Sequence, residues 1–509
     1  MTPTRRTLAM LVVALSVAST GCSSSTKTPP RSTTTTTRAA PRPVFEQASC
    51  NQVLRETGRL PETTVTCGFL VVAENRSKPD GRKVRLAVAR LRTHAAKPAP
   101  DPVVYLHGGP GIATLVNGIG SRLSSPILDR RDLILFDQRG SGFSEPDLQC
   151  PERERAFVDM LAAPKAFTAE LATFDTAIAA CHDRLVRQGI DLDQYNTVQN
   201  AADLADLRTA MGIREWNLWG VSYGTRLALE TLRSHPEGIR SAVLDSVYPP
   251  SAGAVDDVVA SADHALDGLA SGCGTDPACH KAFPDVSGDV DTMVTHLDRH
   301  PYGFDYKPAD GSAGRRLYVT GSAAASGLFN AMYSTDVIAQ LPSILHQVAR
   351  GSYGIVSSIA QSSIPFVNDT SEGAYLSFEC ADNGAKIDEA TVTALRSNPG
   401  RAAVALLAGW NLFCKDWPVK ALPKQFGDVV HSDIPTLVIA GELDPTTPAT
   451  RSRASAAALS HSVFVEVPRG GHVPQSACSA AVNQRFFDDL DHVDTSCTNT
   501  MRPLPFATR

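Results

Sequence analysis

The sequence predicts an α/β fold with a mostly parallel sheet that carries helices on both of its faces. The first observation is that short apolar runs alternate with helical patterns along much of the chain. The second is a serine that stands between two glycines, where one such run meets a helix. The third is that the last two apolar runs are followed by an acid and by a histidine. Because the carboxyl ends of parallel strands share one edge of a sheet, a site is expected there.

The elements follow from apolar periodicity in chain order. Two runs that alternate or stay apolar come first, and we expect them to be edge strands. The expected strands are 65–72, 84–91, 103–106, 133–136, 216–219, 241–246, 435–440 and 463–467. The expected helices between them are 168–188, 200–211 and 226–232.

The central motif is Gly220-Val221-Ser222-Tyr223-Gly224, between the strand at 216–219 and the helix that follows it. A sharp strand-to-helix turn strains the serine backbone, and side chains two residues away on either side would clash. Glycine relieves that clash, which makes this pattern typical of a nucleophile elbow. Ser222 is therefore the predicted nucleophile of an acyl-transfer hydrolase. The alternative, an ordinary strand-to-helix turn, needs further features to exclude it.

Glycines also follow the buried strand at 103–106, in a glycine-proline loop at 107–111. Without a Cβ, the backbone of such a loop can approach a substrate and direct an N–H toward a developing oxyanion. We assign one donor to the Gly109 amide, with Gly108 as the alternative. The second donor is the Tyr223 amide, directly after the nucleophile.

Two polar residues near these loops are interpreted as structural. His107 begins the glycine-proline loop, and we expect it to organise that loop rather than act as a base. Asp137 follows the strand at 133–136 and is expected to organise a loop beside the site.

The remaining catalytic groups follow the last two strands. Asp444 ends a glycine turn after the strand at 435–440, and His472 lies in a Gly-Gly-His loop after the final strand. The chain order Ser222, Asp444, His472 is that of an α/β-hydrolase. Asp245, at the end of the strand after the nucleophile helix, is a rival acid. The rival histidines His235, His431 and His461 lack the Gly-Gly-His context, and we expect them to be solvated or capping residues.

These motifs resemble known peptidases. The loops at 107–111 and 137–142 resemble those of proline iminopeptidases. The elbow at 220–226 and the block from Cys414 to His472 resemble the secreted tripeptidyl aminopeptidases of actinobacteria. The resemblance runs from about residue 60 to the end. It implies an α/β-hydrolase fold and a serine exopeptidase that removes one or a few residues from free peptide N-termini. Iminopeptidases usually carry tryptophan where Tyr223 stands, which argues against strict single-proline specificity.

The gap between nucleophile and acid is far longer than a minimal hydrolase requires. We therefore expect a large, mainly helical cap at 249–430, inserted between a core of 44–248 and one of 431–509. A roofed serine would admit short peptides rather than folded proteins. Helix-compatible stretches within the cap are 258–269, 323–332 and 342–350, with Pro342 in the first turn of the last.

An exopeptidase must recognise a free α-ammonium group, and a desolvated carboxylate does so well. The candidates are Glu379 and Asp382, in the cap segment 378–382. Their alternative interpretation is surface carboxylates on a helix.

The N-terminus indicates export. Two arginines precede an apolar run at 8–18 that is too short to span a bilayer, which is typical of a signal peptide at 1–21. A Gly-Cys pair after that run favours diacylation of Cys22, so the protein would be lipid-anchored at the outer face of the cytoplasmic membrane. The alternatives are an ordinary signal with full secretion, and twin-arginine export. Residues 22–43 are too polar to form a core and are expected to be a tether.

Cysteine usage fits an oxidising compartment. The chain has eleven cysteines, and ten remain when Cys22 is set aside. Proximity in sequence suggests five local disulfides, although the connectivity cannot be deduced from sequence. The suggested pairs are Cys50–Cys67, Cys150–Cys181, Cys273–Cys279, Cys380–Cys414 and Cys478–Cys497.

Composition excludes several other classes of function. A net charge of −5 argues against a nucleic-acid partner. Cysteines and histidines show no metal-ligand spacing, so neither a metal nor another cofactor is expected. Short peptides are the expected substrates, and the oligomeric state is left open. A carboxylesterase or lipid-acyl hydrolase with the same triad is the alternative, and an inactive binding protein on this fold is a third reading.

Overall fold

The computed structural model describes residues 43–54, 64–164, 167–253, 255–307, 313–358, 360–361, 370–384 and 414–508. The predicted signal peptide, the lipidation site Cys22 and all of the predicted tether except Pro43 lie outside these residues. Within them, no helix is both long enough and apolar enough to cross a bilayer.

A single nine-stranded sheet holds the core together, in the order β1-β2-β3-β5-β4-β6-β7-β10-β11. The strands from β5 to β11 in that order run parallel, whereas β1, β2 and β3 pair antiparallel. The mostly parallel sheet is thus confirmed. The expected edge strands at 65–72 and 84–91 lie inside it, because β1, a strand that sequence reasoning missed, forms that edge. The bounds are β1 Val44–Ala48, β2 Val65–Ala73, β3 Lys83–Leu91, β4 Val103–Leu106, β5 Leu133–Phe136, β6 Trp216–Val221, β7 Ile239–Asp245, β10 Thr436–Gly441 and β11 Ser462–Val467.

Helices cover both faces of the sheet because side chains alternate along each strand. In β4, Val104 and Leu106 join one apolar cluster, with α4, α5, α6 and α17. Val103 and Tyr105 join the other cluster, with α1, α2 and α18. The bounds are α1 Cys50–Leu54, α2 Thr114–Arg122, α4 Phe167–Arg187, α5 Thr197–Ala210, α6 Tyr223–Ser234, α17 Ala449–Ala458 and α18 Ala477–Phe486.

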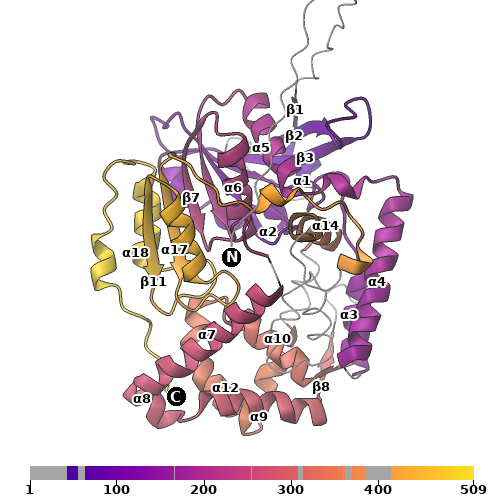
Figure 1. The fold of residues 1–509 in the computed structure, drawn as a ribbon, viewed down its shortest axis with the longest axis vertical. Coiled ribbons are helices and arrows are strands. Elements are labelled where there is room, and N and C mark those ends of the chain that lie inside the picture. The colour runs from indigo at the N-terminus through magenta and orange to yellow at the C-terminus, as the bar shows by residue number, and fades with distance from the viewer. Residues whose placement is uncertain are drawn as a thin grey trace, which may run out of the picture. The chain divides into compact units, whose positions relative to one another are not determined.

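A third apolar cluster forms the core of the cap. The cap helices gather below the sheet in the view of Figure 1. The predicted helices correspond to α7, α10 and α12, and Pro342 lies in the first turn of α12 as expected. A small hairpin of β8 and β9 was not foreseen. The bounds are α7 Val255–Thr275, α8 Pro277–Ala282, α9 Val286–Arg299, β8 Tyr302–Tyr306, β9 Arg315–Val319, α10 Gly321–Ala331, α11 Thr335–Ile338 and α12 Leu341–Ala349.

Two segments cross the predicted boundary between core and cap. Helix α3 (Pro151–Ala162) precedes Ser222 in the chain, yet its Leu161 is buried in the cap cluster. Helix α14 (Glu372–Asn383) lies within the predicted cap range, yet its Phe378 packs in the core cluster and 5.5 Å from the Tyr223 ring, centroid to centroid. The cap range 249–430 therefore contains a helix that returns to the core.

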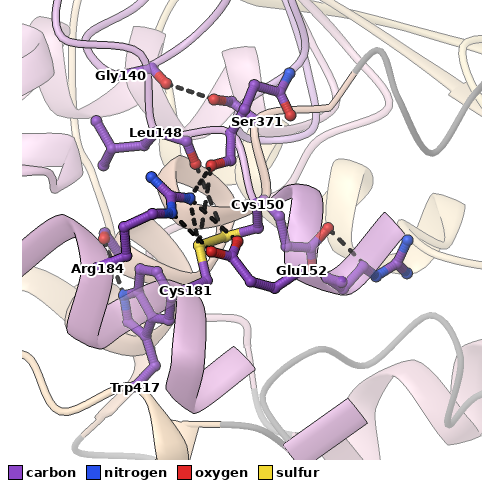
Figure 2. The surroundings of a disulfide bond; sticks show 12 residues. Gly140, Leu148, Cys150, Glu152, Cys181, Arg184, Ser371 and Trp417 are labelled. Carbon is purple, nitrogen blue, oxygen red and sulfur yellow. Dashed lines mark hydrogen bonds and ion pairs between the residues drawn. A yellow bond between two sulfur atoms is a disulfide. The ribbon is translucent and has the colours of Figure 1, made fainter. Parts of the chain in front are cut away.

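All five disulfides suggested by sequence proximity are present. Figure 2 shows Cys150–Cys181, which joins the start of α3 to α4. Arg184 lies against this disulfide and donates to Glu152 at 2.7 Å. The bridge holds together the helix pair that carries Leu161 into the cap.

Candidate active site

Ser222 lies at the turn between β6 and α6, with a φ of 54° and a ψ of −126°. Few L-residues adopt this conformation, so the surroundings must enforce it. A Cβ on Gly220 would lie 2.5 Å from the Gly224 carbonyl oxygen, and one on Gly224 would lie 1.9 Å from the Leu106 carbonyl oxygen. Both glycines are therefore required for this turn, which supports the elbow interpretation over an ordinary turn.

The glycine loop after β4 lies against Ser222. A Cβ on Gly108 would lie 2.7 Å from the Ser222 Cβ and 3.2 Å from its Oγ. Gly109 has a φ of 113°, a conformation that glycine adopts without strain. Tyr223 begins α6, and its side chain is buried. Gly108 and the first amide of α6 thus lie beside Ser222, and Gly109 follows Gly108 in the same loop.

Asp137 organises the neighbouring loops, as predicted. Its carboxylate accepts hydrogen bonds from Leu115 N at 2.9 Å and from Phe143 N at 2.8 Å. Complete burial raises the pKa of Asp137 to about 7, even though these amide hydrogen bonds lower it. One carboxylate therefore joins the start of α2 to the loop after β5.

His107 has the surroundings of a structural residue. Burial, together with the nearby charge of Arg122, lowers the pKa of His107 to about 4. Its ring packs edge-on against Tyr105, and its carbonyl oxygen accepts from Gln138 Nε2 at 3.0 Å. An imidazole that stays neutral at physiological pH adds no charge to the loop.

Asp444 and His472 are hydrogen-bonded, with 2.8 Å between Oδ2 and Nδ1. Asp444 also accepts from the amides of Thr446 and Thr447 and from the Thr447 hydroxyl. Burial alone would raise the pKa of Asp444, but His472 and these hydrogen bonds outweigh it and lower the pKa. Asp444 is therefore ionised at neutral pH and loses its charge only when the pH falls through that lowered value.

Main-chain contacts bring these loops to one edge of the sheet. Ser222 N donates to Asp245 O, and Ser246 N donates to Ile439 O, each at 2.9 Å. The Ser246 hydroxyl in turn accepts from Val473 N at 2.7 Å. The elbow, the Asp444 turn and the histidine loop thus meet at the carboxyl ends of β6, β7, β10 and β11, where open α/β sheets place their sites.

The rival histidines lie elsewhere. His235 precedes β7, His431 precedes β10 and His461 precedes β11, so all three lie near the amino ends of parallel strands. His431 and His461 are exposed, and each contacts a main-chain oxygen through Nδ1. Their positions at the opposite edge of the sheet exclude them from the Ser222 site.

Asp245, the rival acid, is buried beside Asp444. Among the described residues its Oδ1 has no hydrogen-bond partner, whereas His472 is bonded to Asp444. Burial and the charge of Asp444 raise the pKa of Asp245 well above 3.8. The folded state thus favours the protonated, neutral form of Asp245.

Asp245→Asn should therefore keep hydrolysis within a few-fold of wild type and change the pH dependence of stability. In the unfolded chain Asp245 has a pKa near 3.8, whereas in the folded state its pKa is higher. Protonated Asp245 therefore contributes fully to the stability of the folded state below pH 3.8, and this contribution is lost as the pH rises. The free energy of unfolding of the variant minus that of wild type should therefore increase from pH 4 to pH 8, as measured by urea titration. A loss of activity as large as that expected of Asp444→Asn would contradict this prediction and give Asp245 a part in catalysis.

Both predicted amine-binding carboxylates lie on α14 and are buried. Asp382 accepts from the Thr197 amide at 3.2 Å and the Thr197 hydroxyl at 2.5 Å, and lies 3.6 Å from Arg226. Glu379 Oε2 accepts from the Tyr248 hydroxyl at 3.0 Å and from Asn383 Nδ2 at 2.7 Å. The alternative of surface carboxylates is excluded, because both residues belong to a buried polar network.

Burial raises the pKa of Glu379 to about 7, although the charge of Arg226 opposes this rise. Arg226 is itself buried and donates to the main-chain oxygens of Pro249 and Ala252, which precede α7. Its guanidinium carbon lies 3.7 Å from the Tyr248 ring centroid. Sequence reasoning assigned it no role. The signal in the sequence was a cation in the first turns of a helix, directly followed by the apolar residues Leu227 and Ala228. No group of three or more metal-ligating side chains occurs among the described residues.

Comparisons with known proteins cover different parts of the chain. Residues 101–282 match the α/β hydrolase fold family, and residues 403–497 match the family described as TAP-like protein. A tripeptidyl aminopeptidase of Streptomyces lividans is 30% identical over 204 residues, which is 37% of this chain and 36% of that protein. The chain thus aligns with about a third of the length of that relative.

Two further relatives carry peptidase names. The serine protease Hip1 of Mycobacterium tuberculosis is 24% identical over 415 residues, covering 75% of this chain and 76% of that protein. A proline iminopeptidase of Xylella fastidiosa is 29% identical over 151 residues, covering 30% of this chain and 34% of its own length.

Proposed function

We propose that this chain, which has the α/β-hydrolase fold, is a serine exopeptidase that releases one or a few residues from free N-termini of short peptides. The observation that carries the proposal is the 2.8 Å hydrogen bond between Asp444 and His472 at the strand edge that bears the Ser222 elbow. The peptidase names of the relatives support peptides as the substrate class.

In this mechanism the Ser222 Oγ attacks the scissile carbonyl carbon, and its proton passes to His472 Nε2. This is the available nitrogen because Nδ1 is bonded to Asp444. Asp444 holds the imidazole in orientation and stabilises the imidazolium ion. The tetrahedral intermediate then collapses, its C–N bond breaks, and His472 gives the proton to the leaving amine.

The negative oxygen of the intermediate is held by main-chain N–H groups. The proposed donors are the Tyr223 amide and the Gly109 amide, with Gly108 as the alternative. The close approach of Gly108 to Ser222 supports this loop as the source of the second donor. In the second half of the reaction His472 takes a proton from a water molecule, which attacks the acyl-enzyme carbonyl carbon. The C–O bond to Ser222 then breaks, and His472 returns the proton to the Ser222 oxygen.

For recognition of the free N-terminus we propose Glu379 as the residue that contacts the ammonium group. Its two hydrogen bonds both use Oε2, so Oε1 is available to a donor on the substrate. Asp382 has a supporting role, since Thr197 and Arg226 already engage it. The hydroxyls of Thr197 and Tyr223 are 2.6 Å apart, which connects this network to the nucleophile helix.

The proposed location is outside the cytoplasm. Five disulfides within the described residues suit an oxidising compartment. The arginine-led apolar N-terminus supports export, and the Gly-Cys pair supports a lipid anchor on Cys22 at the outer face of the cytoplasmic membrane.

The central test compares a library of short peptides with the same library acetylated at the N-terminus. We expect cleavage of the free library only, near its N-termini, by wild-type enzyme. Glu379→Gln should lower kcat/KM for free peptides about 10- to 100-fold, because a charge-assisted hydrogen bond is lost. It should leave the hydrolysis of a small acyl-nitrophenyl ester unchanged.

The pH dependence gives a second readout of the same experiment. The preference for free over acetylated peptides should rise as the pH passes about 7, where Glu379 ionises. It should fall again above about pH 8, where peptide α-amines lose their proton. Asp382→Asn serves as the neighbouring control and should not abolish the preference. Equal cleavage of both libraries would leave an endopeptidase or an esterase instead.

A further inference from the structure

The loop that carries His472 has a strained backbone. Arg469 has a φ of 51° and Val473 a φ of 52°, a region that L-residues rarely adopt and that is especially unfavourable for a β-branched residue. Such conformations persist only when the surroundings hold them. The orientation of the imidazole therefore depends on what braces this loop.

Three amides of the loop donate to side chains from outside it. Arg469 N donates to Glu442 Oε2 at 2.8 Å, and Val473 N donates to the Ser246 hydroxyl at 2.7 Å. Both of these acceptors follow strands of the core. The third donor, Gly471 N, lies next to His472 in sequence and reaches Thr335 Oγ1 at 3.1 Å. Thr335 begins α11 in the cap, so one of the three braces does not come from the core.

The cap also contacts the imidazole itself. The Tyr333 ring centroid lies 4.6 Å from that of His472, with 60° between the two planes. The Tyr333 hydroxyl lies 2.8 Å from Thr446 Oγ1, and Thr446 N donates to Asp444 Oδ1. Desolvation raises the pKa of Tyr333 to about 12, so its hydroxyl stays protonated. One tyrosine thus touches the histidine and reaches the loop that holds the acid.

Main-chain atoms of the cap lie against the same loop. A Cβ on Gly471 would lie 2.5 Å from the Met332 carbonyl oxygen and 2.6 Å from that of Tyr333. Any residue other than glycine at this position would push the cap away from the histidine. The Gly-Gly-His sequence therefore permits close docking of the segment 332–335, in addition to turning the chain.

The C-terminal tail braces the loop from another direction. Arg469 Nη1 donates to Leu504 O at 3.0 Å, and its guanidinium lies 3.9 Å from the Phe506 ring centroid. Ala507 N donates to Ala339 O, just after α11. The tail thereby connects the histidine loop to the same part of the cap.

We propose that Tyr333 and Thr335 of the cap are positioning residues for His472, so that the catalytic histidine is held correctly only while the cap is docked. This inference rests on the proposed function, since it concerns the same histidine. Neither residue needs to touch the substrate. Their effect on the reaction is exerted through the imidazole and the loop that carries it.

The test replaces each contact separately in the full-length enzyme and measures kcat and KM with a free peptide and with a small acyl-nitrophenyl ester. Thr335→Val keeps the shape but removes the acceptor for Gly471 N, and should lower kcat about tenfold. Tyr333→Leu, which loses both ring and hydroxyl, should lower kcat up to about 100-fold. Tyr333→Phe keeps the ring contact and should fall between wild type and Tyr333→Leu.

KM should stay within about twofold of wild type for both substrates, because the positioning residues act on the histidine rather than on binding. Thr335→Ser restores the hydroxyl and should restore kcat. The control is Thr320→Val: Thr320 Oγ1 caps α10 in the same cap, so its loss should reduce stability without changing kcat. One-dimensional proton NMR adds a direct readout, since the downfield proton of the Asp444–His472 hydrogen bond should broaden in Thr335→Val and not in Thr320→Val.

Two results would overturn the proposal. One is a raised KM with unchanged kcat for Tyr333→Leu, which would make Tyr333 part of the substrate site. The other is equal loss of kcat in Thr335→Ser and Thr335→Val, or in the Thr320 control, which would indicate general disruption of the cap. Ester hydrolysis keeps this test separate from the exopeptidase proposal, because the ester needs the triad but no free amine.

Discussion

Ser222→Ala should lower kcat about 10⁶-fold for peptides and esters alike, because the bond-forming oxygen is removed and the other triad members cannot replace it. The alanine variant should still fold, since alanine retains the Cβ that the elbow at a φ of 54° already accommodates. KM or inhibitor affinity should change little, since the groups proposed to bind the substrate remain. Stopped and continuous assays with an aminoacyl-nitroanilide would measure the loss.

Ser234→Ala is the matched control for this variant. Ser234 lies at the other end of the same helix from Ser222, and its hydroxyl donates to Glu230 O at 2.7 Å. It should retain wild-type kcat. A Ser222→Ala enzyme that kept more than about a hundredth of wild-type turnover would exclude Ser222 as the nucleophile, and with it the acyl-enzyme mechanism.

Asp444→Asn should lower kcat about 10⁴-fold, the second largest effect expected. The amide is nearly isosteric, and its oxygen can still accept from the Thr446 and Thr447 amides that hold Asp444 in place. It cannot, however, provide the negative charge that stabilises the imidazolium ion, and it favours the wrong tautomer of His472. Pre-steady-state kinetics should show slow acylation with substrate affinity retained.

The contrast with Asp245→Asn makes this prediction specific. Both aspartates are buried at the same strand edge, but only Asp444 is hydrogen-bonded to His472. If both variants lost activity equally, the two acids would act as a unit. If only Asp245→Asn lost activity, the assignment of the catalytic acid would have to be reversed.

Much of the candidate site could be proposed from the sequence because its steric requirements are local. The turn requires glycine at 220 and 224, because any Cβ there would collide with the backbone of the turn itself or of β4. This requirement leaves a pattern that is recognisable in the sequence. The loops that carry Asp444 and His472 are also recognisable in the sequence, because each directly follows a short apolar strand. The disulfide pairs suggested by proximity are also local, because each joins cysteines separated by at most 34 residues.

The errors and omissions concern elements whose place depends on distant partners. Strand β1 has an exposed, mixed pattern and exists because it pairs with β2, so periodicity could not detect it. Helix α14 contains polar residues that are satisfied only by Thr197, Tyr248 and other side chains from distant segments. Read locally, such a helix looks amphipathic and exposed, although it is buried in the core.

The sequence by itself therefore determined the class of the fold, and it predicted the order Ser222, Asp444 and His472 of the candidate site and the turns that carry these residues. These depend on steric and hydrophobic rules that act within a few residues. Only the tertiary structure decided that α14 returns to the core, that Arg226 lies among the buried carboxylates, and that Tyr333 of the cap touches His472. Those contacts join residues more than 100 positions apart, and burial creates partners and electrostatic environments that no local pattern contains.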